Sequence, residues 1–176
     1  IAGSVIESTD DVIISATNTS TIDASVLTAS AAVSVGAVAV GASIGASVAR
    51  NFIGYDLAGN ECPTQVQATV TGSTIMAADD VTLTATSVER IDAVVFAGSV
   101  AVSAGVVGVA GSGAGASVTN RIATDVKACI ESSTITGTQA TGARAGDVTL
   151  TAHDTATVFA TAGAASLAGS VGYIGA

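Results

Sequence analysis

Few side chains in this chain could carry out chemistry, and they are scattered. His153 is the only histidine among 176 residues, and no matching nucleophile or carboxylate pattern accompanies it. A serine or cysteine hydrolase needs a base beside its nucleophile, so we interpret His153 as a surface residue. The glycine-rich run 111–115 lacks the lysine and the strand-to-helix context of a phosphate-binding loop, which leaves it a packing role. The sequence therefore predicts no enzyme.

Aspartates stand directly before three predicted strands, at Asp11, Asp80 and Asp147, and a second aspartate precedes the first two. Neighbouring residues on a strand point to opposite faces, which disfavours a glycosidase pair of carboxylates. The GGxGxD pattern of calcium-binding repeats is missing. We therefore expect these acids to cap turns and expect no cofactor. Asp11, Asp80 and Asp147 remain the candidate ligands if a calcium ion binds between neighbouring repeats.

The two cysteines, Cys62 and Cys129, suggest a crosslink. Cys129 aligns with Thr69 of the preceding repeat, only seven residues after Cys62, and its parity on the predicted strand points it outward. A disulfide between them would attach an insertion to the next repeat, as suits an oxidising extracellular setting. A bridge between subunits and two free thiols are the alternatives.

These residues belong to a sequence that is repeated along the chain. Asp11 recurs as Asp80 after 69 residues and as Asp147 after a further 67. The segment 66–70 recurs at 126–130, only 60 residues later, which locates an insertion at about 54–63, and a second insertion lies at about 138–145. We predict repeats at about 3–70, 71–130 and 131–176, the last incomplete, within a single solenoid segment, 1–176.

The elements that carry the repeat are predicted to be strands. Apolar residues alternate with polar ones over 12–17, 81–86 and 148–152, and acids or glycines precede each run. The parity of the alternation flips at a glycine in each repeat, which indicates a bend or bulge. Those glycines are Gly36, Gly105 and Gly172. The run 38–48 has one apolar face, and its other face holds only tiny side chains, which would let another sheet approach closely.

Composition indicates the same architecture. Of the residues 49% are hydrophobic, but aromatics are only 3%, so alanine, valine and glycine must fill the interior, whereas compact globules bury large aromatic side chains. We predict an all-β protein, a parallel β-solenoid of about three repeats of about sixty residues with two loop insertions. Its core is expected to be flattened, dry and made of alanine, valine and glycine.

Charge and hydropathy limit the partners. A net charge of −9 with five Lys and Arg disfavours nucleic acid and anionic membrane surfaces, which need basic patches. The segments 24–49 and 93–120 carry no charge and are long enough for transmembrane helices. Strict alternation, many serines and glycines, and the missing basic flanks and aromatic belt favour the solenoid instead. We expect no membrane insertion.

The repeat pattern DVTLTATS…IDA…AGSVAVSAG…GVAGSGAGASVTN…VKACIESSTIT resembles the repeats of giant bacterial surface proteins, the filamentous-haemagglutinin-like and leukotoxin-type adhesins. The resemblance covers nearly all of the chain apart from the two insertions. It implies a secreted or cell-surface bacterial β-solenoid that serves as a stalk, fibre or adhesin. The insertion with Tyr55, Cys62 and Pro63 departs from the pattern.

We therefore expect a structural building block of an extracellular fibre, whose solenoid units stack head to tail. The chain starts and stops within a repeat, so we expect a segment of a longer array or a unit that its neighbour completes. The alternative is an adhesin module that binds a surface receptor or glycan through its insertions. A pectate-lyase-type enzyme lacks the clustered charges it needs, and the threonine rank 82–86 that could bind ice is broken in the first repeat.

Overall fold

The computed structural model describes residues 1–137 and 146–175. Its strands are β1 (Val5–Ser8), β2 (Val12–Ile53), β3 (Thr64–Thr71), β4 (Thr74–Ala77), β5 (Val81–Ile122), β6 (Thr124–Glu131), β7 (Thr134–Gly137) and β8 (Val148–Gly175). The described residues contain no helix, and hence no helical segment that could cross a membrane. The predicted second insertion, 138–145, lies outside the described residues.

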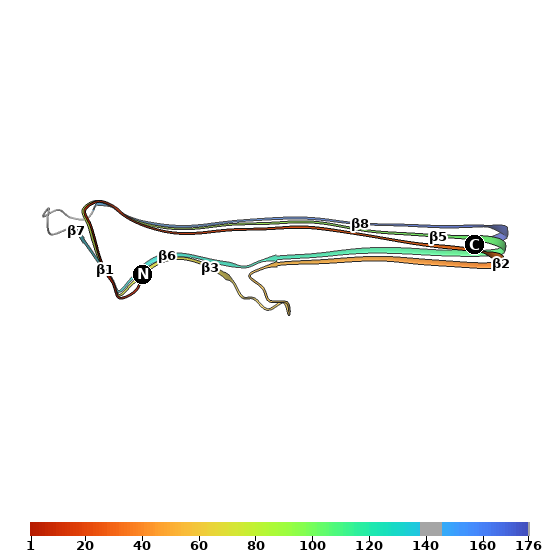
Figure 1. The fold of residues 1–176 in the computed structure, drawn as a ribbon, viewed down its shortest axis with the longest axis horizontal. Coiled ribbons are helices and arrows are strands. Elements are labelled where there is room, and N and C mark those ends of the chain that lie inside the picture. The colour runs from red at the N-terminus through yellow and green to blue at the C-terminus, as the bar shows by residue number, and fades with distance from the viewer. Residues whose placement is uncertain (138–145, 176) are drawn as a thin grey trace. The chain divides into compact units, whose positions relative to one another are not determined.

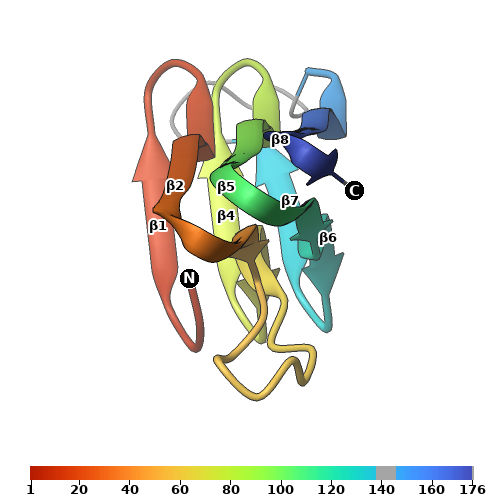
Figure 2. The same cartoon turned by 90° about the vertical axis from the view of Figure 1, so that its right-hand side faces the viewer.

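The strands form parallel sheets in the orders β1-β4-β7, β2-β5-β8 and β3-β6 (Figure 2). Val5 pairs with Thr74, and Thr64 pairs with Thr124, so the offsets follow those of the sequence repeat. We call β1–β3 the first winding, β4–β6 the second, and β7 with β8 the third. The predicted all-β parallel solenoid is confirmed. The repeat boundaries remain a prediction, because pairing fixes the register and not the point where a repeat begins.

The chain divides into two compact units, and strands β2, β5 and β8 contribute to both. Unit 1 contains Ile1–Thr21, Phe52–Arg90 and Arg121–Thr157, and unit 2 contains Ile22–Asn51, Ile91–Asn120 and Val158–Ala176.

Unit 1 has a conventional apolar core. Ile75 and Leu83 are its largest apolar side chains with no exposed surface, and branched and small residues from the neighbouring strands surround them. Corners between strands use left-handed backbone at Gly3 and Gly72, and Ser132 takes the same conformation with φ of 50° at the equivalent corner of the next winding. Each winding therefore turns at the same place.

Unit 2 is built from two layers. In β2 the residues 22–35 form an outgoing limb and 38–51 a returning limb, and in β5 the corresponding limbs are 91–104 and 107–120 (Figure 1). The burial pattern changes parity between Val35 and Ala39, where the chain turns back. The phase slip that the sequence placed at Gly36 is therefore a bend, as predicted.

Glycine is required at this bend because the windings touch there. A Cβ built on Gly105 would overlap the carbonyl oxygen of Gly36, and one built on Gly172 would overlap that of Gly105. The two layers also touch further along, since a Cβ on Gly45 would overlap the carbonyl oxygen of Gly98. Close approach between sheets, which the sequence predicted from the tiny side chains, is confirmed.

Alanine and valine make up most of the buried apolar residues, as expected, but the close spacing changes the composition within unit 2. The interior of unit 2 is mainly alanine, glycine and serine, whereas Val38, Val40 and Ile44 are exposed. Hydroxyl groups pair across the layers, with Ser30 Oγ 2.8 Å from Ser43 Oγ. Layers this close leave little room for branched side chains between them. Ile91 and Val95 are fully buried, but most valines of the limbs lie on the outside.

Replacing Gly105 with alanine should lower the free energy of unfolding by about 2 kcal/mol or more, because the new methyl group meets a backbone carbonyl that cannot move aside. Gly111→Ala is the matched control, since a Cβ there has nothing within 4 Å. Urea unfolding measures both. Equal midpoints for the two variants would contradict the close contact at the bend.

Candidate functional site

The structure brings no catalytic group together with His153. Its ring lies exposed on β8, and its Nε2 is 3.1 Å from Thr155 Oγ1. Within the described residues, no carboxylate and no cysteine is hydrogen-bonded to the ring. The position thus has the geometry of a surface residue, as the sequence indicated.

The repeated aspartates form a ladder at one corner of unit 1. Asp11 Oδ1 accepts a hydrogen bond from the backbone N–H of Asp80 at 3.0 Å, and Asp80 Oδ1 accepts one from the N–H of Asp147 at 2.8 Å. Each carboxylate thus caps the turn of the next winding. The expected turn-capping role is confirmed for Asp11 and Asp80.

Serines form a second ladder, at another corner of unit 1. The N–H of Ser4 donates to Ser73 Oγ at 3.1 Å, and the N–H of Ser73 donates to Ser133 Oγ at 3.1 Å. Each hydroxyl donates in turn to a carbonyl two residues earlier in the chain. This ladder was not predicted, although serine recurs at the same place in each repeat, directly after a glycine in the first two.

The two ladders run in opposite senses along the stack. At the first winding, within the described residues, no further winding lies beside the Asp11 N–H donor and the Ser4 Oγ acceptor. At the third winding, no further winding lies beside the Ser133 N–H donor and the Asp147 carboxylate acceptor. Each side of the stack therefore offers one donor and one acceptor that match those of the other side. These edges are the candidate functional site.

The acidic corner differs from the predicted calcium site. The carboxylates that lie within 4.8 Å of one another belong to Asp10, Asp11 and Asp79, so of the three predicted ligands only Asp11 takes part. Asp80 and Asp11, together with partial desolvation, raise the pKa of Asp79 above its usual value. The corner is thus crowded with negative charge on the solvent side, while one oxygen each of Asp11 and Asp80 is used in the ladder.

The predicted disulfide does not form in the structure. Cys62 and Cys129 are both free thiols. Cys129 pairs in register with Thr69, as predicted, and its Sγ is 3.5 Å from Glu131 Oε1 on the outer face. Cys62 lies in the loop before β3, and the strand residues from Thr64 to Thr69 alone span roughly 17 Å, far beyond the Cα separation that a disulfide can bridge. Its backbone N–H is also held at 2.8 Å by the carbonyl of Gly54.

A buried carboxyl group that the sequence analysis did not single out lies inside unit 1. Glu89 has no exposed surface, and its Oε1 accepts hydrogen bonds from Asn18 Nδ2 and Thr124 Oγ1, each at 3.1 Å, and from Ser87 Oγ. The pKa of Asp154 on β8 is raised, chiefly by desolvation. A hydrogen bond with Glu89 and the charge of Glu89 raise this pKa further. Parity along the repeat could have shown that Glu89 points inward.

The first insertion forms an ordered loop. Tyr55 and Glu61 pair as an antiparallel bridge, and Asp56 accepts two hydrogen bonds from Asn60, each at 2.8 Å. These bonds lower the pKa of Asp56. Arg121 lies 5.7 Å from the ring centre of Tyr55 at the base of the loop.

The loop presents an apolar residue to solvent, because Leu57 is 99% exposed between Asp56 and Asn60. The hydrogen bonds between these two flanking residues close the loop around it. Leu57 is therefore an exposed apolar group in a loop whose ends are fixed.

No family model, no curated protein and no solved structure matches the chain.

Replacing Asp154 with asparagine should stabilise the fold at neutral pH and make its stability less dependent on pH. A raised pKa means that the folded chain favours the neutral carboxyl, so this contribution to stability is full below about pH 4 and disappears as the pH rises through the raised value. Asparagine stays neutral throughout and can still donate to Glu89. Urea midpoints across this range measure the effect.

Asp23→Asn, an exposed aspartate in unit 2, is the control for simple removal of a negative charge. If both variants gain the same stability at neutral pH, general charge repulsion is responsible and the contact with Glu89 is not.

Proposed function

We propose that this chain is a non-enzymatic building block of an extracellular or cell-surface fibre, in which solenoid windings stack end to end. The observation that carries the proposal is the matching pair of open edges. Strands β1, β2 and β3 of the first winding are the edge strands at one side of the three sheets. At the other side the edge strands are β7 and β8 of the third winding and, in the two-stranded sheet, β6 of the second. Each outer edge offers unpaired backbone groups to a further strand.

The corner ladders add specificity to this stacking. The Asp147 carboxylate of one copy can accept from the Asp11 N–H of the next, and the Ser133 N–H of the first can donate to Ser4 Oγ of the second. Repetition of the contacts within the chain supports this register. A head-to-tail contact of this kind does not close on itself and produces a filament.

A bacterial cell-surface location is part of the proposal. It is supported by the resemblance of the repeat to those of giant surface adhesins and by the small, unreactive side chains of the sheets. The acidic net charge of −9 favours solubility of a valine-rich stack and offers no basic patch for nucleic acid.

Replacing Ser15 with proline should block filament growth and leave the chain folded. The N–H of Val12 donates to Asp80, and alternate residues of a parallel strand face opposite neighbours. The N–H groups of Ile14 and Ala16 therefore face β5, and that of Ser15 faces the open edge. Proline removes only this outward donor. Negative-stain electron microscopy and light scattering should show filaments for the unmodified chain and discrete particles for Ser15→Pro.

Ala16→Pro is the matched control, because it removes a donor to β5 and should reduce the stability itself. Filaments of unchanged length from a folded Ser15→Pro chain would refute end-to-end stacking through this edge.

A second candidate function is adhesion through the first insertion. The specific observation in its favour is the ordered loop that exposes Leu57, held at its base by Arg121. Loops on a rigid scaffold commonly carry binding. The binding partner would be a receptor or glycan on another surface.

Deleting 56–60 and joining the ends with two glycines should abolish binding to host-cell or glycan surfaces under the adhesin hypothesis, while filaments persist. Leu57→Ser is the milder control, since it removes the exposed apolar group and keeps the loop hydrogen bonds. Binding that survives the deletion would exclude the loop as the contact surface.

A further inference from the structure

Unit 2 buries mostly small side chains and exposes large apolar ones. Its interior contains serine and threonine hydroxyls that bond across the layers, such as Thr28 with Ser47 and Ser99 with Ser112. Its outside carries large apolar residues. On the outgoing limbs, the most exposed of these are Leu27, Val33, Val35, Leu167 and Val171, each at least 66% exposed. Exposed apolar faces of this kind mark interaction sites.

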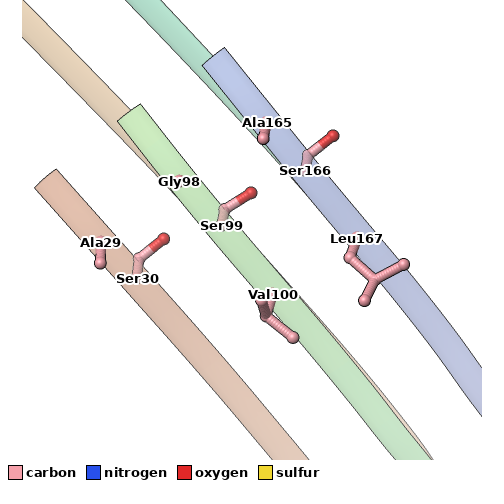
Figure 3. Close-up of a pocket in the computed structure, with 8 residues that line it drawn as sticks. All are labelled: Ala29, Ser30, Gly98, Ser99, Val100, Ala165, Ser166 and Leu167. Atoms are coloured by element: carbon pink, nitrogen blue, oxygen red, sulfur yellow. The ribbon is translucent and has the colours of Figure 1, made fainter. Parts of the chain in front are cut away.

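The outer face of the outgoing limbs has a defined relief. A groove of about 260 Å³ crosses the three strands of this face, with Ala29, Gly98 and Ala165 side by side along it (Figure 3). Val100 and Leu167 point to the same side as the alanine side chains and form a ridge beside the groove (Figure 3). The neighbouring serine hydroxyls point the opposite way.

We propose that this face binds the same face of a second copy of the chain, with the ridge of each copy seated in the groove of the other. A two-fold axis that runs along the stacking direction, between the groove and the ridge, places Val100 over Gly98 and Leu167 over Ala165. The strands of the two copies then run antiparallel across the interface. The contact is self-complementary, as a two-fold interface requires.

The size of the face suits a dimer. Six outward residues on each of three strands cover about 40 by 14 Å, or roughly 550 Å² for each copy. The total of about 1,100 Å² passes the lower limit for a specific interface. The groove volume accommodates one valine and one leucine side chain, which are the residues that the ridge supplies.

The charges also favour an antiparallel contact between copies. The charged residues of unit 2 are Asp23, Arg50 and Asp92, near the ends of the limbs that lie away from the bend. Two copies in parallel would place Asp23 and Asp92 beside their own counterparts. The antiparallel arrangement instead places them beside the uncharged bend of the partner.

A lipid bilayer is a less suitable occupant, although the face is apolar. The outer edges of β2 and β8 in unit 2 have no neighbouring strand within the described residues. Roughly seven residues along each limb would then present an N–H and a carbonyl to hydrocarbon without partners, and open sheet edges of this kind do not occur in the bilayer core. In a dimer in water the edges remain solvated or free to stack.

The two-fold axis coincides with the direction of stacking. Two proposed fibres could therefore pair side by side with the same polarity, each winding meeting its counterpart. The dimer itself does not depend on end-to-end stacking, so it can be tested separately from the proposed function.

The test uses the Ser15→Pro chain, so that stacking through the edge of β2 does not contribute, with both cysteines changed to serine. Gly98→Cys and Val100→Cys are made in separate chains; a Cβ at Gly98 meets its nearest neighbour at 3.8 Å, an ordinary contact. Under mild oxidation, the mixed sample should form disulfide-linked dimers, and each chain alone should form several-fold fewer. Equal crosslinking in the unmixed samples, or none in the mixture, would overturn the ridge-in-groove register.

Sedimentation velocity supplies the second measurement. Leu167→Asp should shift the dimer to monomer, whereas Ile44→Asp, at an 81% exposed position on the outside of the other layer, should leave the dimer intact. Loss of the dimer in both variants would assign the association to general hydrophobicity. A monomer that floats with phosphatidylcholine vesicles would assign the face to lipid. Either result refutes the proposal, whatever the outcome for filaments.

Discussion

Parallel, in-register pairing between windings is the constraint on which the rest of this structure depends. Because each paired residue lies beside its counterpart 60, 67 or 69 positions later, any side chain that suits one winding must also suit contact with the equivalent side chain of the next. Gly36 therefore lies against Gly105, and Asp11 caps the turn at Asp80. A residue type that does not fit at one position does not fit at the equivalent position of the other windings either. The repeat in the sequence follows from this condition.

Close spacing of the two layers in unit 2 has the widest consequences. Contact between Gly45 and the backbone of Gly98 limits the interior to glycine, alanine and serine over much of the limbs. Serine is tolerated there because hydroxyls of facing limbs bond to each other. Most valines and the leucines of the limbs then lie outside, so the packing itself leaves large apolar side chains exposed to water. Burial of the outer face against another copy would reduce that exposure.

Much of this architecture could be predicted from the sequence. The features that could not be predicted were missed for physical reasons. The bend at Gly36 was predictable because parity flips where a glycine recurs. Alternation alone does not say which of two faces is inside, so the exposed position of Val38 was missed. Parity along β5 could have shown that Glu89 points inward. Its hydrogen-bond partners could not be predicted, because the equivalent residues of the other two windings are a serine and an alanine. The disulfide between Cys62 and Cys129 was predicted from alignment across repeats, which ignores distance along the strand.

Cryo-electron microscopy of assembled protein, at a resolution that separates strands, tests the central claim most directly. We predict filaments in which strands repeat about every 4.8 Å along the axis. At each junction, β8 of one copy should lie beside β2 of the next, and the aspartate and serine ladders should continue from one copy to the other. Discrete particles at concentrations where the chain is fully folded would contradict end-to-end stacking. Filaments whose junctions do not pair β8 with β2 would contradict it equally.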